Sequence, residues 1–364
     1  MRILLITPTR LEDPTYRHVL CGLGAAYRSL GHEAAAAGQM EPEAGGLPVE
    51  EASWGRIHRS GGRGRLKGAS RALRTFLETR RLLQAADFVH VVAPLAWSLR
   101  LVAIEAACRW MRKPRGLTLQ SCANPELPAA RRWRRGPLNR FLSRFSWVTV
   151  LSRGEKNALA ALTNAPARIV PNGFDPVERD QAPPAPSPRP FVLCVARFSK
   201  YKGLDVLLMA WSDVCRRSSE IDLVIAGAGP LAAHLESLAG LLGIGARVRF
   251  AGVLPRPQLW GSMKSCLFLV LPSRYESFGI AALEAMACGK AVVATRCGGP
   301  EEFIADEVTG LLLPPEDAGA LGAAVSRLLE DPALRERLGA RAREAARGYR
   351  WEDAAGRYLE LARP

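Results

Sequence analysis

The sequence has few of the features that mark membrane, secreted or metal-binding proteins. None of its apolar runs reaches the roughly 18–20 residues that a membrane-spanning helix needs. The eight cysteines include no C-x-x-C pair and the five histidines are dispersed, so neither a zinc site nor a disulfide framework is indicated. This pattern predicts a cytoplasmic enzyme with reduced thiols and no metal. The opening residues MRILLITPTR lack a cleavage-site pattern and predict a buried first strand rather than a signal peptide.

The length and composition indicate a globular chain of two domains. The chain has 364 residues, about twice a usual domain, of which 48% are hydrophobic and 23% charged. Residues 181–190 (QAPPAPSPRP) contain five prolines and predict a linker, because proline cannot sustain a helix. We therefore expect an N-terminal domain over 1–180, a C-terminal domain over 191–345, and a final helix over 346–364 that packs back on the N-terminal domain.

Positive charge is concentrated in the first half of the chain. Residues 1–180 contain 28 Lys and Arg against 15 Asp and Glu, whereas residues 181–364 contain 22 against 20. The excess gathers in 56–81 and 131–144. The aromatic residues near these cations are Trp54, Phe76 and Trp133. This mixture predicts peripheral binding to the anionic inner face of a membrane, with a solvated basic face as the alternative. No nucleic-acid-binding motif accompanies the charge, so nucleic acid is not expected as a partner.

Short β-branched runs alternate with longer helical stretches in both halves. Strands are predicted at 2–7, 88–92, 116–119, 147–151, 168–170, 191–195, 222–226, 247–251, 267–271 and 291–294. Helices are predicted between them, for example at 203–216 and 280–288. The alternation predicts an α/β fold of two Rossmann-like domains, with parallel sheets covered by helices. We expect the two domains to face each other across a cleft, with the strand carboxyl ends toward it.

Two turns rich in cations or glycine follow predicted strands of the second half. The sequence VARFSKYKG (195–203) places Arg197 and Lys202 at the start of a helix, where an anion is favoured. The sequence AGAGP (226–230) supplies Gly227 and Gly229 for a tight strand-to-helix turn. It lacks the third glycine of G-x-G-x-x-G, so it does not indicate a nicotinamide cofactor. Taken alone, each motif also fits an ordinary turn.

Two acidic residues, Glu276 and Glu284, lie within the next turn and helix, LPSRYESFGIAALEAMACGK. Gly279 lets the backbone approach a ligand, and the amides that start the helix form an anion pocket. Eight helical residues rise about 12 Å, beyond the roughly 5–9.5 Å of hydrolytic carboxylate pairs, so hydrolysis by this pair is not expected. A further Gly-rich turn, TRCGGPEE, starts at Thr295. Together the four motifs predict a site for a nucleotide diphosphate that carries a sugar.

In combination these motifs resemble the donor-binding half of family-4 retaining glycosyltransferases, which have the two-Rossmann-domain (GT-B) architecture. The resemblance rests on VAR with the following Lys202, on AGAGP, on two glutamates with seven residues between them, and on MACG and GLLL further along. The segment IVPNGFD (169–175) is similar to the end of the family's first domain, and Asn172 within it is taken as a donor-binding candidate.

The resemblance implies a role for each matched residue. Arg197 and Lys202 would hold the diphosphate and stabilise the leaving group, Glu276 would bind hydroxyls of the donor sugar, and Glu284 would bind the ribose. The sugar would also meet the backbone amides of Phe278, Gly279 and Ile280. No cofactor or metal is implied, because protein cations neutralise the diphosphate. The anomeric configuration would be retained, with the leaving phosphate itself deprotonating the acceptor.

The first half departs from the family pattern in two places. Members often carry a Gly-Gly pair after the first strand, where residues 8–14 here are PTRLEDP. Many carry a histidine where Gln120 and Ser121 stand. His90 is a candidate base of the first domain, although a hydrogen-bonded core histidine fits its position better.

The acceptor implied by these features is a hydroxyl compound. Because the first half is basic, a lipid-linked envelope or polysaccharide intermediate is expected, and a soluble natural product is the alternative. A nucleotide-sugar epimerase of the same architecture is a third hypothesis. Turnover of the donor without any acceptor would distinguish it.

Overall fold

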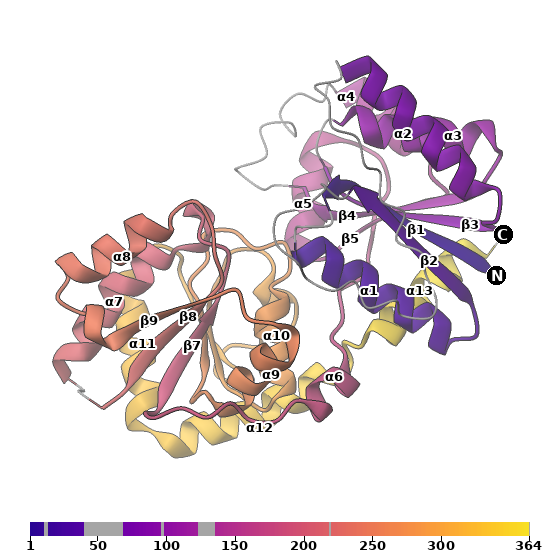
Figure 1. The fold of residues 1–364 in the computed structure, drawn as a ribbon. Coiled ribbons are helices and arrows are strands. Elements are labelled where there is room, and N and C mark those ends of the chain that lie inside the picture. The colour runs from indigo at the N-terminus through magenta and orange to yellow at the C-terminus, as the bar shows by residue number, and fades with distance from the viewer. Residues whose placement is uncertain (11–13, 40–67, 96–97, 123–134, 218–219, 364) are drawn as a thin grey trace. The chain divides into compact units, whose positions relative to one another are not determined.

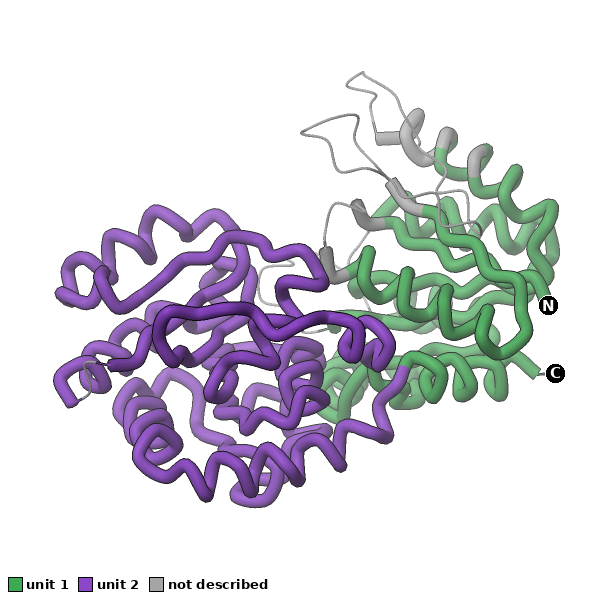
Figure 2. The backbone as a smooth tube through the Cα atoms, turned by 60° about the horizontal axis from the view of Figure 1, so that its bottom comes forward, with its two compact units in different colours: residues 1–173, 351–364 green, residues 174–350 purple. Residues whose placement is uncertain are grey.

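A computed structural model describes residues 1–10, 14–39, 68–95, 98–122, 135–217 and 220–363, which form two compact units. Unit 1 comprises residues 1–173 and 351–364, and unit 2 comprises residues 174–350 (Figure 2). The chain therefore passes between units at Gly173/Phe174 and at Arg350/Trp351, whereas the proline-rich residues 181–190 lie inside unit 2. Of the basic clusters, 56–67 and 131–134 fall outside the described residues, as do Trp54 and Trp133.

Unit 1 is a six-stranded parallel sheet in the order β2-β1-β3-β4-β5-β6 (Figure 1). Its strands are β1 (Arg2–Arg10), β2 (Glu33–Gln39), β3 (Phe88–Pro94), β4 (Arg115–Ser121), β5 (Trp147–Val150) and β6 (Arg168–Ile169). Its helices are α1 (Pro14–Ser29), α2 (Gly68–Leu83), α3 (Leu99–Trp110), α4 (Arg135–Leu142), α5 (Arg153–Leu162) and α13 (Trp351–Ala362).

Unit 2 is a second six-stranded parallel sheet, in the order β12-β11-β10-β7-β8-β9. Its strands are β7 (Phe191–Val195), β8 (Asp222–Ala226), β9 (Val248–Gly252), β10 (Leu269–Leu271), β11 (Val292–Thr295) and β12 (Leu311–Leu313). Its α-helices are α6 (Pro176–Gln181), α7 (Leu204–Arg217), α8 (Ala232–Leu241), α9 (Arg256–Ser265), α10 (Ile280–Ala287), α11 (Ala318–Glu330) and α12 (Pro332–Ala346). Three short 3-10 helices are η2 (Lys200–Lys202), η3 (Gly245–Arg247) and η4 (Pro300–Glu302).

The strand order of unit 2 fixes where a ligand can bind. Counted from β7, the order is that of a dinucleotide-binding Rossmann sheet, and the direction of winding reverses between β7 and β10. In open parallel sheets, ligands bind outside the strand carboxyl ends at this switch point, because the loops on either side diverge there. The loops after β7 and after β10 carry the motifs that contain Lys202 and Glu276.

The predicted α/β fold is confirmed, and all ten predicted strands are present within a few residues. Two strands were not predicted. β2 is EAAAAGQ, and alanine is depleted in strands, yet it pairs in parallel with β1 from Glu33 onward. β12 has only three residues, too few to show a pattern, and pairs with β11.

The C-terminal helices end where their sequences indicate. The Asp331 carboxylate accepts a hydrogen bond from the Leu334 amide at 2.8 Å, and Pro332 occupies the first turn of α12, so one residue ends α11 and starts α12. Helix α13 returns to unit 1 and packs on α1, where the Trp351 indole fills the space above Gly22. No helix among the described residues is long and apolar enough to cross a membrane.

Candidate functional site

An ion pair between Lys202 and Glu276 joins the two loops at the switch point of unit 2. The Lys202 ammonium donates to Oε1 of Glu276, and the two side chains are only 15% and 9% exposed. Burial alone lowers the pKa of Lys202, but the charge of Glu276 and the hydrogen bond to it help to outweigh burial, so the pKa is raised above its ordinary value. The lysine is therefore a fixed cation at neutral pH. An anion that enters the site competes with Glu276 for it.

Residues from the loop after β10 and from β11 hold the Glu276 carboxylate in place. The Ser273 hydroxyl donates to Oε1 of Glu276 at 3.1 Å, and the Thr295 hydroxyl donates to the Ser273 carbonyl oxygen. Burial raises the pKa of the Cys297 thiol to about 12, and Glu276 adds to that rise, which places this thiol near the pair. These supporting residues were not predicted, because their roles depend on which strands are neighbours.

Arg274 ties the loop after β10 to the loop that carries Lys202. Its guanidinium donates two hydrogen bonds to the Asp205 carboxylate, both at 2.8 Å, and one to the Lys200 carbonyl oxygen at 2.7 Å. The Arg274 amide also donates to the Tyr201 carbonyl oxygen at 2.8 Å. The hydrogen bonds of Arg274 to Asp205 lower the pKa of that carboxyl group. Arg274 therefore fixes the distance between the two switch-point loops.

Glycines allow the loops of the site to approach one another closely. A Cβ atom on Gly227, whose φ is 140°, would collide with the Ala196 carbonyl oxygen. A Cβ atom on Gly229 would lie 2.5 Å from the Phe198 carbonyl oxygen, and one on Gly299 would lie 2.6 Å from the Phe278 amide nitrogen. The turns that contain these glycines therefore pack against the loops after β7 and β10. This packing explains the glycines of AGAGP and CGG whether or not a ligand is bound.

The helix α10 presents its amino end next to Glu276. Gly279 is its N-cap with a φ of 98°, and no side chain of the described residues caps the helix by a hydrogen bond. The first amides of such a helix favour an anion or an oxygen acceptor. Because α10 begins at Ile280, Glu276 lies in the loop before it, and a helical rise of eight residues does not describe its separation from Glu284. The two carboxylates nevertheless have separate cationic partners.

Glu284 lies in the second turn of α10 and is 2% exposed. Its Oε1 atom forms an ion pair with Nη2 of Arg256, the first residue of α9, at 2.7 Å. Sequence reasoning selected Glu284 but did not find Arg256, which follows the turn after β9. The position of Arg256 at the start of a helix after a strand was the available signal.

Arg197 and Asn172, the other predicted donor-site residues, have different surroundings. Arg197 lies on the loop after β7 with an exposed side chain. Asn172 belongs to unit 1 and is buried, and its side-chain amide donates to Oε1 of Gln120 at 3.0 Å while accepting from Gln120 at 3.4 Å. The Asn172 amide is thus engaged within unit 1, and its role toward a donor stays a prediction.

His90 is a core residue of unit 1. Its ring nitrogens lie 2.9 Å from the Tyr27 hydroxyl and 2.8 Å from the Thr118 hydroxyl, and its ring packs against Trp147 and Tyr358. Burial lowers the pKa of His90 to about 3, so the ring is neutral at physiological pH. Both ring nitrogens have hydrogen-bonding partners in the core. His90 is therefore the hydrogen-bonded core histidine that the sequence favoured over a candidate base.

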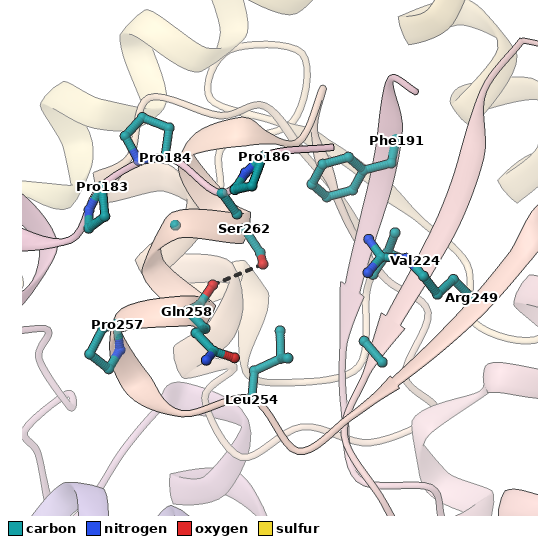
Figure 3. A pocket seen from close by; sticks show the side chains of 13 residues that line it. Pro183, Pro184, Pro186, Phe191, Val224, Arg249, Leu254, Pro257, Gln258 and Ser262 are labelled. Atoms are coloured by element: carbon teal, nitrogen blue, oxygen red, sulfur yellow. Dashed lines mark hydrogen bonds between the residues drawn. The ribbon is translucent and has the colours of Figure 1, made fainter. Parts of the chain in front are cut away.

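A cavity of about 360 Å³ lies beside α9, apart from the Lys202–Glu276 pair (Figure 3). Residues 183–186 of the proline-rich segment line one side, and Val224, Leu254 and Gln258 are among the others. None of the lining residues belongs to the switch-point loops. The candidate donor site therefore lies at the carboxyl ends of β7 and β10 and not in this cavity. Among the described residues, no group of three or more His, Cys, Asp or Glu is arranged to hold a metal ion.

Two family models divide the chain between them. The model described as "Glycosyl transferases group 1" matches residues 177–345, and the model described as "Glycosyltransferase Family 4" matches residues 18–178. The chain belongs to glycosyltransferase family 4. The family-4 resemblance inferred from the motifs is thereby confirmed.

The names of curated relatives of this family-4 chain mention different compounds. An alpha-D-kanosaminyltransferase of Streptomyces kanamyceticus is 38% identical over 150 residues, which cover 41% of this chain and 39% of the relative. A D-inositol 3-phosphate glycosyltransferase of Catenulispora acidiphila is 33% identical over 202 residues, which cover 52% of this chain and 48% of the relative. These matches span about half the length of the curated relatives or less.

Solved structures resemble the family-4 chain over almost its whole length. A sucrose-phosphate synthase from Thermosynechococcus elongatus has a TM-score of 0.79 at 24% identity, covering 99% of this chain and 98% of that chain. The Anabaena HepE protein in complex with UDP and glucose also has a TM-score of 0.79, at 19% identity, with coverages of 99% and 98%. At these identities the likeness concerns the fold, which is of the GT-B type.

Proposed function

We propose that the chain is a retaining glycosyltransferase that moves a sugar from a nucleotide-diphosphate donor to a hydroxyl acceptor. The observation that carries the proposal is the Lys202–Glu276 ion pair at the switch point of unit 2. The pair places a cation next to a carboxylate that can accept hydrogen bonds from hydroxyl groups. Membership of family 4 supports it. So do solved structures of the same fold whose complexes contain UDP and glucose or UDP-glucose.

The residues of the site suit each part of such a donor. Lys202 and Arg197 lie on one loop and supply positive charge to the diphosphate. Glu276, released from Lys202 when the diphosphate binds, accepts hydrogen bonds from sugar hydroxyls. The amino end of α10, over Phe278, Gly279 and Ile280, offers amides to the same groups.

In the proposed reaction, the bond between the sugar's anomeric carbon and the phosphate oxygen breaks, and its electron pair stays on the phosphate. The acceptor oxygen bonds to the same carbon from the same face, and its proton passes to the departing phosphate oxygen. Lys202 and Arg197 stabilise the charge that develops on the diphosphate. Because these cations neutralise the leaving group, we expect transfer to continue in the presence of EDTA.

For the acceptor, we propose a lipid-linked intermediate at an anionic membrane surface on the cytoplasmic side. Helix α2 supports this: Leu73 and Leu77 are 60% and 51% exposed, and Arg80 and Arg81 are exposed as well. These four residues stand at positions i, i+4, i+7 and i+8, so they form one stripe along the helix. Exposed leucines beside arginines suit the boundary of an anionic bilayer.

A soluble acceptor is the second candidate. The likeness to the D-inositol 3-phosphate glycosyltransferase favours it, because that relative is named for a small phosphorylated compound. Another relative of similar identity favours the lipid-linked acceptor, because it is named a phosphatidylinositol monomannoside mannosyltransferase.

A donor screen tests the proposed function. Purified protein is mixed with UDP-, GDP-, ADP- and dTDP-sugars, and protection against thermal unfolding is measured. The donor that protects is then supplied with lipid-linked and soluble acceptors in a product assay. We expect at least one donor to protect the wild type and Glu276→Ala to abolish product. If no donor protects and Glu276→Ala changes nothing, the proposal is wrong.

A further inference from the structure

A single guanidinium, that of Arg256, bridges two carboxylates of unit 2. Its Nη2 atom lies 2.7 Å from Oε1 of Glu284 and 2.9 Å from Oε2 of Glu178, and its Nε atom donates to the same Glu178 oxygen at 3.1 Å. The guanidinium carbon lies 5.0 Å from the centre of the Trp260 ring, whose Nε1 atom also donates to Glu178 at 3.2 Å. Glu178 and Trp260 therefore hold the Arg256 guanidinium in place, in addition to its ion pair with Glu284.

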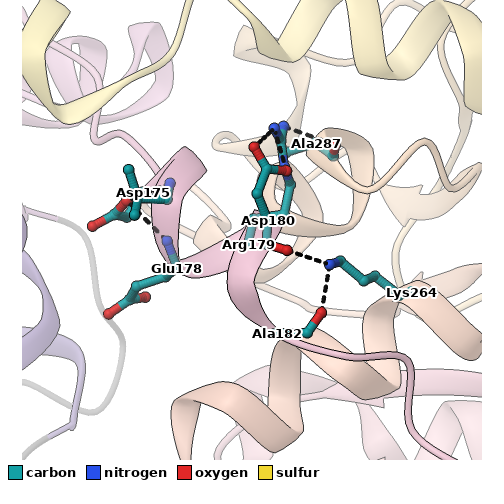
Figure 4. Close-up of polar contacts among 8 residues, drawn as sticks. Asp175, Glu178, Arg179, Asp180, Ala182, Lys264 and Ala287 are labelled. Atoms are coloured by element: carbon teal, nitrogen blue, oxygen red, sulfur yellow. Dashed lines mark hydrogen bonds and ion pairs between the residues drawn. The ribbon is translucent and has the colours of Figure 1, made fainter.

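Glu178 is itself fixed, because α6 is anchored to the helices around it (Figure 4). The Asp175 carboxylate caps α6 by accepting from the Glu178 amide at 3.2 Å. Arg179 donates to the Ala287 carbonyl oxygen of α10 at 3.3 Å, and the Lys264 ammonium of α9 donates to the Ala182 carbonyl oxygen. The two ion pairs of Arg256 thus link Glu178 of α6 and Glu284 of α10 through the first residue of α9.

The position of Glu284 requires a cation. A carboxylate that is 2% exposed loses its hydration, and a charged or hydrogen-bonding partner has to replace the lost water contacts. Arg256 supplies that charge from outside α10 through the 2.7 Å ion pair. To accept hydrogen bonds from two neighbouring ribose hydroxyls, a carboxylate must also be held in one orientation.

We infer that Arg256 is a positioning residue for the nucleotide: its ion pair holds the Glu284 carboxylate in the orientation that accepts the ribose hydroxyls, and Glu178 orients Arg256 in turn. This inference rests on the proposed function, in which Glu284 binds the ribose. Arg256 acts through Glu284 and makes no contact with the reacting atoms. Substitution of Arg256 is therefore expected to change the recognition of the ribose and not that of the diphosphate.

The test compares UDP, GDP and ADP with their 2′-deoxy counterparts, using dissociation constants from calorimetry. For the nucleotide that binds, we expect the wild type to prefer the ribose form by about tenfold or more, because hydrogen bonds to charged groups are strong. In Arg256→Gln and in Glu284→Gln, the preference falls to about threefold or less. Arg256→Lys keeps the charge but not the planar guanidinium, so we expect a preference for the ribose form between those of the wild type and Arg256→Gln. This variant replaces Arg256→Gln in the test if the glutamine variant fails to fold. Inorganic pyrophosphate binds all of these variants equally.

Arg247→Gln is the matched control. Arg247 pairs with Asp222 at 3.0 Å with side chains that are 16% and 25% exposed, and this pair lies at the amino ends of β8 and β9. The control is expected to keep the wild-type ratio. An unchanged ratio in both Arg256 variants would overturn the inference.

The outcomes separate this inference from the proposed function. If Glu284→Gln keeps the wild-type ratio while Glu276→Ala abolishes transfer, the ribose role of Glu284 and the inference are both wrong, but the transferase stands. If neither nucleotides nor nucleotide sugars bind the wild type, the proposed function fails as well.

Discussion

The Arg274 guanidinium and the Asp205 carboxylate meet through two parallel hydrogen bonds of 2.8 Å each, which join the loop after β10 to the start of α7. Paired hydrogen bonds of this kind fix direction as well as distance. Lys202 lies three residues before Asp205, and Glu276 lies two residues after Arg274. The Arg274–Asp205 pair therefore sets the position of the Lys202–Glu276 pair.

Arg274→Gln is expected to lower kcat/KM by about 10- to 100-fold, because displacement of a positioned group by about 1 Å has effects of that size. Steady-state kinetics with the donor found by screening measures the loss. Arg327→Gln is the control, since Arg327 also binds a carboxylate, that of Glu307, through two guanidinium nitrogens but on the surface of α11. Equal activity of the two variants would show that the Arg274 contact has no positioning role.

Two glycine substitutions should have opposite effects on stability. Gly227→Ala is expected to destabilise the protein by about 2–4 kcal/mol, because a Cβ atom at its positive φ collides with the loop after β7. Gly240→Ala in α8, where a Cβ atom meets nothing within 4 Å, is expected to stabilise it by about 0.5–1 kcal/mol. Urea unfolding measures both. A Gly227→Ala protein as stable as the wild type would show that the close approach is not required.

The sequence predicts the local elements of the fold and site but not the contacts between distant segments. Turn glycines and β-branched runs are local signals, so the strands and the residues of the switch-point loops were predictable. The partners of those residues were not, because pairs such as Arg256–Glu284 arise from segments that only the strand order brings together. The alanine-rich β2 was missed because its pairing with β1, rather than its composition, makes it a strand.

The pKa of His90, which burial lowers to about 3, predicts a pH-dependent stability. The unfolded chain binds a proton at His90 below about pH 6.5 while the folded chain does not, so stability is complete above that pH and falls as the pH drops toward 3. Between pH 6 and pH 4, the wild type should lose about 1.4 kcal/mol per pH unit more than His90→Gln. Urea titrations at pH 6, 5 and 4 compare the two proteins. Parallel pH profiles would contradict a neutral His90 in the core.

The exposed stripe on α2 predicts binding to anionic membranes. The protein is expected to sediment with vesicles of phosphatidylglycerol and phosphatidylcholine, and the bound fraction should fall as salt is raised from about 0.05 to 0.5 M, because salt screens the attraction of Arg80 and Arg81. The double variant Leu73→Ser/Leu77→Ser should bind less at every salt concentration. Binding that is insensitive to both salt and these substitutions would exclude α2 as the contact.

The central claim is that Lys202 holds the diphosphate of a nucleotide-sugar donor at the switch point of unit 2. Its most direct test is the rate of sugar transfer by Lys202→Met, measured with the donor identified by screening. Because removal of one preorganised charge from a developing anion costs about 10²- to 10³-fold in rate, we expect kcat to fall by that factor while the variant stays folded. A Lys202→Met protein that transfers sugar at the wild-type rate would contradict the account.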